Sequence, residues 1–368
     1  MRILVHCVYF PPEVGGLESH VFYLCRALAQ KGHTVEVVTS RSLPGVPKEE
    51  EMDGIRVYRT WFPARNALGW GVHALGSIPT TRSLACKADV IHAQAFASVA
   101  PCVFGRQASG APLVATFHTS HFLARAENPL WAPLLGAMVR APDHALAASK
   151  EIASVAEGLA RGRPVEALTN GVETDVFRPV DPALPPSGRP RIVVPRRLFP
   201  KNGVEFFIRA LPLILAQAEV DAILVGDGPE RGRLESLSES LGVANRVSFL
   251  GKRAHQEMPG LLCSGSLAVI PSLMEATSVA ALEAMACGLP VASSNVGGLP
   301  EIVDESVGGL FAPGNPEDLA RVVTNLLDDP RLGEKGAEAR KRVKADWSNQ
   351  RLADRHLEIY EGLLQGRG

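Results

Sequence analysis

The sequence has almost no net charge, since 38 basic and 39 acidic side chains leave a formal charge of −1 over 368 residues. This balance gives no global electrostatic reason to expect nucleic acid or an anionic membrane as a partner. No apolar run reaches the length of a membrane span, and the first residues lack the long apolar core and small-residue cleavage site of a signal peptide. We therefore expect a soluble, cytoplasmic protein that binds no nucleic acid.

Paired cysteines are also missing. The six cysteines are scattered through apolar segments, without the spacing of a disulfide framework or a zinc site. His118 and His121 have no carboxylate or thiolate close by in the sequence, so we expect neither a metal ion nor another cofactor. The turn at Gly15 and Gly16 does not follow the Gly-x-Gly-x-x-Gly pattern, which removes the fingerprint of a nicotinamide cofactor.

Short apolar, β-branched runs alternate with longer helical patterns along the chain. This alternation is typical of βα units and of a parallel sheet covered on both faces. The first set of runs covers residues 2–9, 34–40, 55–60, 89–93, 112–118, 145–149 and 165–169. The second set covers residues 191–195, 222–226, 247–250, 267–271, 290–293 and 309–311. The predicted fold class is α/β, with two doubly wound, Rossmann-like sheets.

The chain is long enough for two domains. Its 368 residues exceed the size at which one hydrophobic core usually stops growing, and the stretch between Arg178 and Arg189 has the Pro, Asp and Ser content of a linker. We predict an N-terminal domain over residues 1–180 and a C-terminal domain over residues 181–346, facing each other across a cleft. The helical pattern over residues 347–368 is expected to pack back on the N-terminal domain.

The most informative motif contains two glutamates, Glu275 and Glu283, eight residues apart, where a predicted strand leads into a predicted helix. Thr277 or Ser278 is a good N-cap, and Gly288 is a good C-terminal stop. A helix start binds anions through its free amide groups and its dipole, so this turn is a candidate phosphate seat. Glu283 would then hold ribose hydroxyls, and Glu275 would reach a sugar beyond the phosphates. The spacing suits a nucleotide sugar.

Further candidate loops follow other predicted strands. Gly15 and Gly16 would let a backbone approach a phosphate or a sugar, although a tight turn without a ligand is an equal alternative. His118 ends a strand and would donate to a sugar hydroxyl or to the reacting oxygen, with a structural histidine as the alternative. Gly226 begins another such loop.

A basic loop opens the second domain. Arg196, Arg197 and Lys201 follow its first strand, where they would neutralise the growing charge of a departing diphosphate without a metal. The alternative is a solvated basic loop. The neighbouring motifs favour the diphosphate interpretation.

Together these motifs give the chain a specific resemblance over nearly its whole length. It resembles the retaining glycosyltransferases of family 4, which have the GT-B fold. The resemblance rests on Gly15-Gly16, Thr116-Phe-His118-Thr, Ser149-Lys150, Asn170-Gly-Val172 with Asp175 and Phe177, the Arg196 to Gly203 loop, Gly226-Asp-Gly228, and the two-glutamate motif up to Gly288.

The resemblance implies a role for each motif. Glu275 would bind hydroxyls of the donor sugar, Glu283 the nucleotide ribose, and His118 the transferred sugar, while Gly16 would offer its backbone amide. The implied catalytic residues are His118, Glu275, Arg196 and Lys201. The implied donor-binding residues are Gly15, Gly16, Arg197, Gly226, Thr277, Ser278, Val279 and Glu283.

The basic loop departs from the family pattern. In the family an Arg precedes a Lys that is directly followed by Gly, whereas here Asn202 separates Lys201 from Gly203. Arg196 has the family's interval to Lys201, and we favour it for the phosphate clamp, while Arg197 has the interval counted from Gly203.

The resemblance also implies the reaction, that of a hexosyltransferase. A hexose would pass from a UDP- or GDP-linked donor to a hydroxyl of a glycan, a glycolipid or a small molecule, with retention at the anomeric carbon and without a metal. Two alternatives stay open: a nucleotide-sugar epimerase or phosphorylase of the same architecture, and a non-catalytic protein that binds sugar nucleotides.

The acceptor is the least defined partner. The segment from Trp61 to Trp70 places aromatic side chains beside Arg59 and Arg65, in the domain where similar enzymes bind acceptors. A lipid-linked acceptor and a weak peripheral contact with the inner face of the membrane therefore stay open. Core packing of the aromatic side chains is the favoured alternative.

Overall fold

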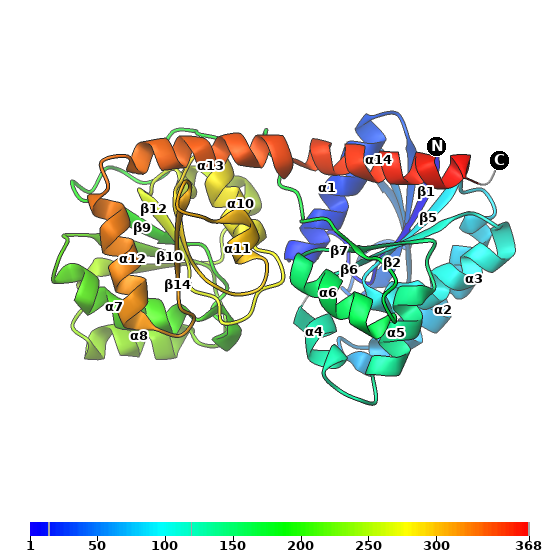
Figure 1. Cartoon of the computed structure of the whole chain (residues 1–368), viewed down its shortest axis with the longest axis horizontal. Coiled ribbons are helices and arrows are strands. Elements are labelled where there is room, and N and C mark those ends of the chain that lie inside the picture. The colour runs from blue at the N-terminus through cyan, green and yellow to red at the C-terminus, as the bar shows by residue number, and fades with distance from the viewer. Residues whose placement is uncertain (14, 119, 367–368) are drawn as a thin grey trace. The chain divides into compact units, whose positions relative to one another are not determined.

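The computed structural model describes residues 1–13, 15–118 and 120–366 of the chain. It divides into two compact units: the first holds Met1–Gly171 and Asn349–Gly368, and the second holds Val172–Ser348 (Figure 1). The chain thus enters the second unit before the predicted boundary at residue 180, and it returns to the first after residue 348.

The proline-rich stretch that was expected to be a linker lies inside the second unit. Ala183 donates a backbone hydrogen bond to the Gly260 carbonyl, and the Leu184 N–H donates to Ser264 Oγ. Arg191 reaches the carbonyl of Ser264 from the other end of the stretch. Because these long-range hydrogen bonds fix it in place, the stretch is part of a packed unit rather than a connection between two units.

Within the described residues of the first unit, eight strands form one sheet in the order β3-β4-β2-β1-β5-β6-β7-β8. The strands are β1 (Arg2–His6), β2 (Thr34–Arg41), β3 (Glu49–Met52), β4 (Ile55–Trp61), β5 (Val90–Gln94), β6 (Leu113–Phe117), β7 (His144–Ala147) and β8 (Glu166–Ala167). β3 runs antiparallel to β4, and the other pairs of these strands are parallel. The sequence does not predict β3, because its Glu-Glu-Glu-Met run has low strand propensity.

The helices of the first unit are α1 (Gly16–Gln30), α2 (Ala67–Ala85), α3 (Val99–Ser109), α4 (Ser120–Ala126), α5 (Ala132–Arg140), α6 (Lys150–Leu159) and α14 (Asn349–Gln365). α1 and α14 share one core with the sheet, in which Leu24 and Leu28 of α1 pack with Leu352 and Tyr360 of α14. The C-terminal helix is therefore a structural part of the first unit.

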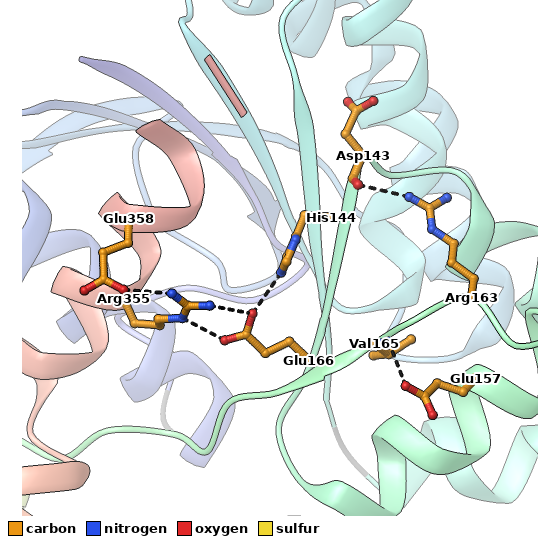
Figure 2. A network of polar contacts seen from close by, with 8 residues as sticks. All are labelled: Asp143, His144, Glu157, Arg163, Val165, Glu166, Arg355 and Glu358. Carbon is orange, nitrogen blue, oxygen red and sulfur yellow. Dashed lines mark hydrogen bonds and ion pairs between the residues drawn. The ribbon is translucent and has the colours of Figure 1, made fainter. Parts of the chain in front are cut away.

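An ion-pair network also holds α14 on the sheet. Arg355 of α14 binds Glu166 of β8 through two hydrogen bonds of 2.8 and 3.0 Å (Figure 2). His144 of β7 lies 3.1 Å from the same carboxylate, and Glu358 accepts a further bond from Arg355 at 2.7 Å. The network joins the last strands of the sheet to the last helix of the chain.

Over residues 172–348, all of them described, six parallel strands form a second sheet in the order β11-β10-β9-β12-β13-β14. The strands are β9 (Arg191–Val194), β10 (Asp221–Val225), β11 (Val247–Gly251), β12 (Leu267–Ile270), β13 (Val291–Ser294) and β14 (Gly308–Phe311). Numbered from β9, this order is 3-2-1-4-5-6, which is that of a doubly wound nucleotide-binding sheet.

The helices of the second unit are α7 (Val204–Leu215), α8 (Arg231–Ser240), α9 (Met258–Leu262), α10 (Val279–Ala286), α11 (Leu299–Ile302), α12 (Pro316–Asp328) and α13 (Leu332–Asp346). Successive residues of one strand point to opposite faces, so Ile192 and Val194 pack toward α7 and α12, while Val193 packs toward α10 and α13. Both faces are covered, as Figure 1 shows for this unit. The predicted α/β class with two Rossmann-like sheets is confirmed.

Among the described residues, no helix is long and apolar enough to cross a membrane. The cysteines in the same ranges are free thiols. No group of three or more His, Cys, Asp or Glu side chains in this described part is arranged to hold a metal ion.

Candidate active site

In each unit, candidate residues gather where the strand order reverses. β9 and β12 are neighbours in the second sheet, and β1 and β5 are neighbours in the first. Ligands of doubly wound sheets bind outside the carboxyl ends of the strands at such a switch point. Arg196 follows β9 and Glu275 follows β12, while Gly15 follows β1 and Gln94 ends β5. Chain topology therefore places polar residues from distant segments together.

Arg196 is the centre of the polar cluster in the second unit. Its largely buried guanidinium contacts the carboxylate of Glu275 and the hydroxyl of Ser272, and it lies 3.5 Å from Ser278 Oγ. Ser272 Oγ donates to Glu275 at 3.3 Å. Arg196 Nε is buried and has no hydrogen-bond partner among the described residues. The cluster therefore combines an arginine charge, a carboxylate and an unused donor.

Two glycines let neighbouring loops approach the loop after β9. Gly226 has a φ of 152°, and a Cβ there would lie 2.1 Å from the Arg196 carbonyl oxygen. Gly203 has a φ of 63°, and a Cβ there would lie 2.0 Å from the Pro271 carbonyl oxygen. A side chain at either position would displace the loop that holds Arg196 against Glu275.

Lys201 lies in the same loop and is half-buried. Burial lowers the pKa of its ammonium group, the neighbouring Arg197 adds to this effect, and Glu275 opposes it. The Lys201 carbonyl accepts the backbone N–H groups of residues 273 and 274, at 2.9 and 3.3 Å. Lys201 therefore fixes the segment that leads to Glu275 as well as adding positive charge beside it.

Arg197 has a different environment from Arg196. Its side chain is exposed, and the guanidinium carbon lies 5.7 Å from the centre of the Phe199 ring. Arg196, rather than Arg197, therefore contacts Glu275 and the start of α10.

The start of α10 faces this cluster. Ser278 is the N-cap, since its Oγ accepts the Ala281 N–H at 3.3 Å, and this decides between the two predicted caps. Thr277 is buried beside it, and Val279 is the first helical residue. The positive end of the helix dipole and the guanidinium of Arg196 therefore act on the same space.

Glu283 on α10 is paired with a residue that sequence reasoning missed. His255, in the short helix η4 (His255–Glu257), places Nε2 3.0 Å from Glu283 Oε1. The His255 ring packs edge-on against Phe177, with ring centres 4.9 Å apart. Its position in the polar stretch after β11, at the carboxyl end of a strand, is the signal that could have indicated it.

In the first unit, Gly15 is the N-cap of α1, and Gly16 is the first helical residue. Gly15 has an extended φ of 178°, and a Cβ there would lie 2.2 Å from the Glu18 carboxylate. Glu18 thus folds back over the first turn of α1. Its negative charge occupies part of the field that a helix start offers to anions.

His118 follows β6 and is 2% exposed. Its Nε2 lies 2.7 Å from Gln94 Oε1, and its Nδ1 has no hydrogen-bond partner within the described ranges. Burial, followed by the charge of His356, lowers the pKa of His118 to about 3, so the imidazole is neutral at pH 7. Thr119, the last residue of the predicted Thr-Phe-His-Thr motif, lies outside the described residues.

Models of two glycosyltransferase domains match most of the chain. The model described as Glycosyltransferase Family 4 matches residues 14–176, and the model described as Glycosyl transferases group 1 matches residues 189–329. The chain belongs to glycosyltransferase family 4. This retaining-family enzyme transfers a sugar from a nucleotide-sugar donor, and the resemblance seen in the motifs is confirmed.

Curated relatives of this glycosyltransferase cover nearly its whole length. It is 28% identical over 375 residues to a phosphatidylinositol N-acetylglucosaminyltransferase of Arabidopsis thaliana, covering 99% of this chain and 83% of the relative. It is 29% identical over 403 residues to glycogen synthase of Mycobacterium tuberculosis, covering 100% of this chain and 96% of the relative. The two relatives have different acceptors in their names.

Solved structures share the fold of the glycosyltransferase. Sucrose-phosphate synthase from Thermosynechococcus elongatus has a TM-score of 0.87 at 23% identity, covering 99% of each chain. HepE of Anabaena, solved with UDP and glucose, has a TM-score of 0.78 at 20% identity and covers 98% of this chain and 100% of that one. The predicted GT-B fold is thereby confirmed.

The aromatic segment of the glycosyltransferase is partly packed and partly exposed. Phe62 is buried, and Trp70 Nε1 donates to Tyr9 at 2.9 Å. Trp61 and Leu68, in contrast, are 64% and 76% exposed. A cavity of about 510 Å³ lies beside them, lined by residues 41–46, Trp61 and Phe62. Core packing thus accounts for only part of the segment.

Proposed function

We propose that this glycosyltransferase moves a hexose from a UDP-hexose to an acceptor hydroxyl, with retention and without a metal ion. The observation that supports this most directly is the contact of buried Arg196 with Glu275, beside the N-cap of α10. A diphosphate at this point meets a guanidinium, an ammonium from Lys201 and a helix start. UDP rather than GDP is favoured because the HepE structures of the same fold contain UDP.

The residues of the second unit have distinct roles in this proposal. Glu275 binds hydroxyls of the donor sugar, and Glu283 binds the ribose. The acceptor hydroxyl attacks from the face of the leaving group, and the departing phosphate takes its proton. Arg196 and Lys201 stabilise the negative charge that grows on the diphosphate, so the protein acts mainly by positioning and neutralisation.

The residues of the first unit contact the sugar in this proposal. His118 offers its unpaired Nδ1 to a sugar hydroxyl, and Gly16 offers its backbone amide. A neutral imidazole suits this role, because a hydroxyl donates to its unprotonated nitrogen.

A ligand screen followed by product analysis tests the proposed donor. UDP and UDP-hexoses are expected to raise the thermal midpoint, because a ligand at 100 times its Kd adds about 2.7 kcal/mol to stability. GDP- and ADP-sugars serve as matched controls. The anomeric configuration of the product, read by NMR, must equal that of the donor, and activity must survive a chelator. Stabilisation by GDP-sugars alone, or an inverted product, contradicts the proposal.

One variant separates the transferase from the alternatives. Glu275→Gln keeps the size of the side chain but removes its charge, so transfer should fall by orders of magnitude while the thermal midpoint is kept. A wild-type enzyme that converts the donor without an acceptor would be an epimerase, and one that requires inorganic phosphate would be a phosphorylase. Donor binding without turnover on any acceptor would indicate a binding protein.

We also propose a lipid-linked acceptor reached through a peripheral membrane contact of the first unit. Trp61, Leu68 and Leu75 are 64%, 76% and 69% exposed, and Arg65 lies near the first two in the chain. Exposed Trp and Leu side chains with basic neighbours are typical of interfacial surfaces. The Arabidopsis relative is named for a phosphatidylinositol acceptor, which supports an inositol lipid as the first candidate.

Vesicle co-sedimentation tests this contact. The enzyme should sediment with phosphatidylcholine vesicles containing phosphatidylinositol at low salt, and the double variant Trp61→Ser, Leu68→Ser should lose this binding. Leu213→Ser, at a leucine that is 40% exposed in the second unit, is the matched control. Equal sedimentation of both variants and the wild type removes the proposed surface.

A further inference from the structure

A chain of buried polar side chains leads from His118 to the C-terminal helix. His92 and Gln94 lie on the same face of β5, because side chains two residues apart in a strand point the same way. Gln94 is paired in register with Thr116 on β6, and Tyr360 of α14 covers this face. His92, Gln94 and Tyr360 are all fully buried.

The contact between His118 and Gln94 determines where the imidazole proton lies. His118 Nε2 is 2.7 Å from Gln94 Oε1, and an amide oxygen can only accept a hydrogen bond. The proton of the neutral ring is therefore on Nε2. Nδ1 then carries a lone pair, and it is buried without a hydrogen-bond partner in the described part of the chain.

The neighbouring His92 determines which way the Gln94 amide faces. Both ring nitrogens of His92 already have hydroxyl partners, Tyr360 at 2.6 Å from Nδ1 and Thr116 at 2.7 Å from Nε2. Gln94 Nε2 lies 3.3 and 3.5 Å from the same two nitrogens. An N–H group against an aromatic ring is attractive, whereas a carbonyl oxygen there is not. Gln94 is thereby held with its oxygen toward His118.

The unpaired atoms beside His118 are acceptors that need a donor. Asn170 interacts with His118, and its Oδ1 is likewise buried without a partner among the described residues. Buried polar atoms are normally paired, so two unpaired acceptors at a switch point indicate a ligand that donates hydrogen bonds. A sugar hydroxyl is such a donor.

We propose that Gln94 is a positioning residue that fixes His118 in the tautomer protonated at Nε2, so that Nδ1 accepts a hydrogen bond from a hydroxyl of the transferred sugar. This inference rests on the proposed function, in which His118 contacts that sugar. His92, held by Tyr360 of α14, keeps Gln94 in the required orientation. The C-terminal helix thus contributes to the geometry of the site through three side chains.

The tautomer itself is measured by NMR on the full-length protein without substrate. Histidines labelled with nitrogen-15 give long-range proton–nitrogen correlations that distinguish the two neutral tautomers, and a His118→Asn sample assigns the signal. The wild type should show the Nε2–H form. Gln94→Met, which keeps the length of the side chain but has no acceptor oxygen, should show a mixture or the Nδ1–H form. An Nδ1–H signal in the wild type, or an unchanged tautomer in Gln94→Met, overturns the proposal.

Kinetics test whether this geometry matters for transfer. Gln94→Met should lower kcat by about tenfold or more while KM for the donor changes little, which is the pattern for an interaction used mainly in the transition state. Thr81→Val is the matched control, because Thr81 is buried in α2 and donates only within that helix, to Ser77. It should leave the tautomer and kcat unchanged.

The two proposals fail in distinguishable ways. A fully active His118→Ala variant would remove His118 from the proposed function, whatever the tautomer. An inactive His118→Ala variant together with a fully active Gln94→Met variant would keep that function and remove the positioning role of Gln94. Thermal midpoints of all variants check that each one is folded.

Discussion

His255 Nε2 and Glu283 Oε1 are 3.0 Å apart, although the residues lie on different helices, η4 and α10. At neutral pH the carboxylate accepts and the imidazole N–H donates. One oxygen of Glu283 is thereby engaged, and the other is directed away from His255. The pair fixes the orientation of the carboxylate that we propose for the ribose.

Removal of His255 should weaken donor binding modestly. The pair is partly exposed, with 31% and 12% of the two side chains accessible, so we expect His255→Ala to raise the Kd for UDP by about two- to fivefold. Titration calorimetry measures this, with Gln256→Ala as the neighbouring control. An unchanged Kd would separate His255 from the donor site.

The two arginines of the basic loop should differ in their effect on catalysis. Arg196→Met removes charge-assisted hydrogen bonds next to Glu275, and losing 1.5 to 3 kcal/mol corresponds to a fall in kcat of about 10- to 150-fold. Arg197→Met removes an exposed contact with Phe199 and should cost less than about threefold. Steady-state kinetics on both variants decide the point, and the reverse order of effects would assign the clamp to Arg197.

Glu166 should stabilise the attachment of α14 in a pH-dependent way. Burial alone raises its pKa, but the hydrogen bonds and charge of Arg355, with those of His144, outweigh this and lower it. A lowered pKa in the folded state gives stability that is present above the pKa of the unfolded chain and is lost as pH falls through the folded value. Glu166→Gln should therefore lower the thermal midpoint at pH 7 by about 2 to 4 °C, and by less near pH 3.

The control for Glu166 is Glu358, which binds the other side of the same Arg355 and is 52% exposed. Glu358→Gln should shift the thermal midpoint by less than Glu166→Gln at pH 7. Equal shifts would mean that the strand side of the network adds nothing specific.

His356 should make the protein less stable in mild acid. The ring is buried, Nδ1 donates to the Leu352 carbonyl at 2.8 Å, and burial lowers its pKa to about 4. Between pH 4 and the unfolded value near 6.5, the unfolded chain binds the proton and the folded chain does not, so stability falls as pH falls. His356→Leu should reduce this slope by up to about 1.4 kcal/mol per pH unit in chemical denaturation. His121→Gln, at an exposed histidine, should leave the slope unchanged.

Cys263 should be the most reactive thiol of the chain. A hydrogen bond with Cys287, with smaller help from the Val180 N–H and the charge of Arg340, lowers its pKa to about 6, although burial opposes this. The thiolate is the reactive form, so alkylation by iodoacetamide at pH 7 should modify Cys263 before the more exposed Cys86. Peptide mass spectrometry of a time course gives the order, and faster modification of Cys86 would falsify the expectation.

Much of the fold follows from local patterns in the sequence. Runs such as Ile192–Val194 and Leu267–Ile270 are apolar and β-branched, and each forms a strand that is buried on both faces. β3 could not be predicted in this way, because its glutamates favour a strand only where β4 provides an antiparallel partner. The proline-rich stretch was misleading for a related reason, since its composition indicates a linker while hydrogen bonds to Gly260 and Ser264 fix it.

The site was predicted in outline. Glu275, Glu283, Lys201 and His118 stand in recognisable motifs, and Ser278 had the residue type of a cap. The choice between neighbouring arginines, by contrast, depends on which side chain turns inward, and residue spacing does not contain that information.

The sequence by itself determined the α/β class, the family and the loops that follow the strands, because strand periodicity, helix caps and short motifs are local properties of the chain. The tertiary structure decided the partners: Arg196 with Glu275, His255 with Glu283, and Gln94 with His118. These contacts join residues separated by 79, 28 and 24 positions. They form because the reversal of strand order and the packing of helices bring distant segments to the same edge of a sheet, and no local pattern specifies which side chains then meet.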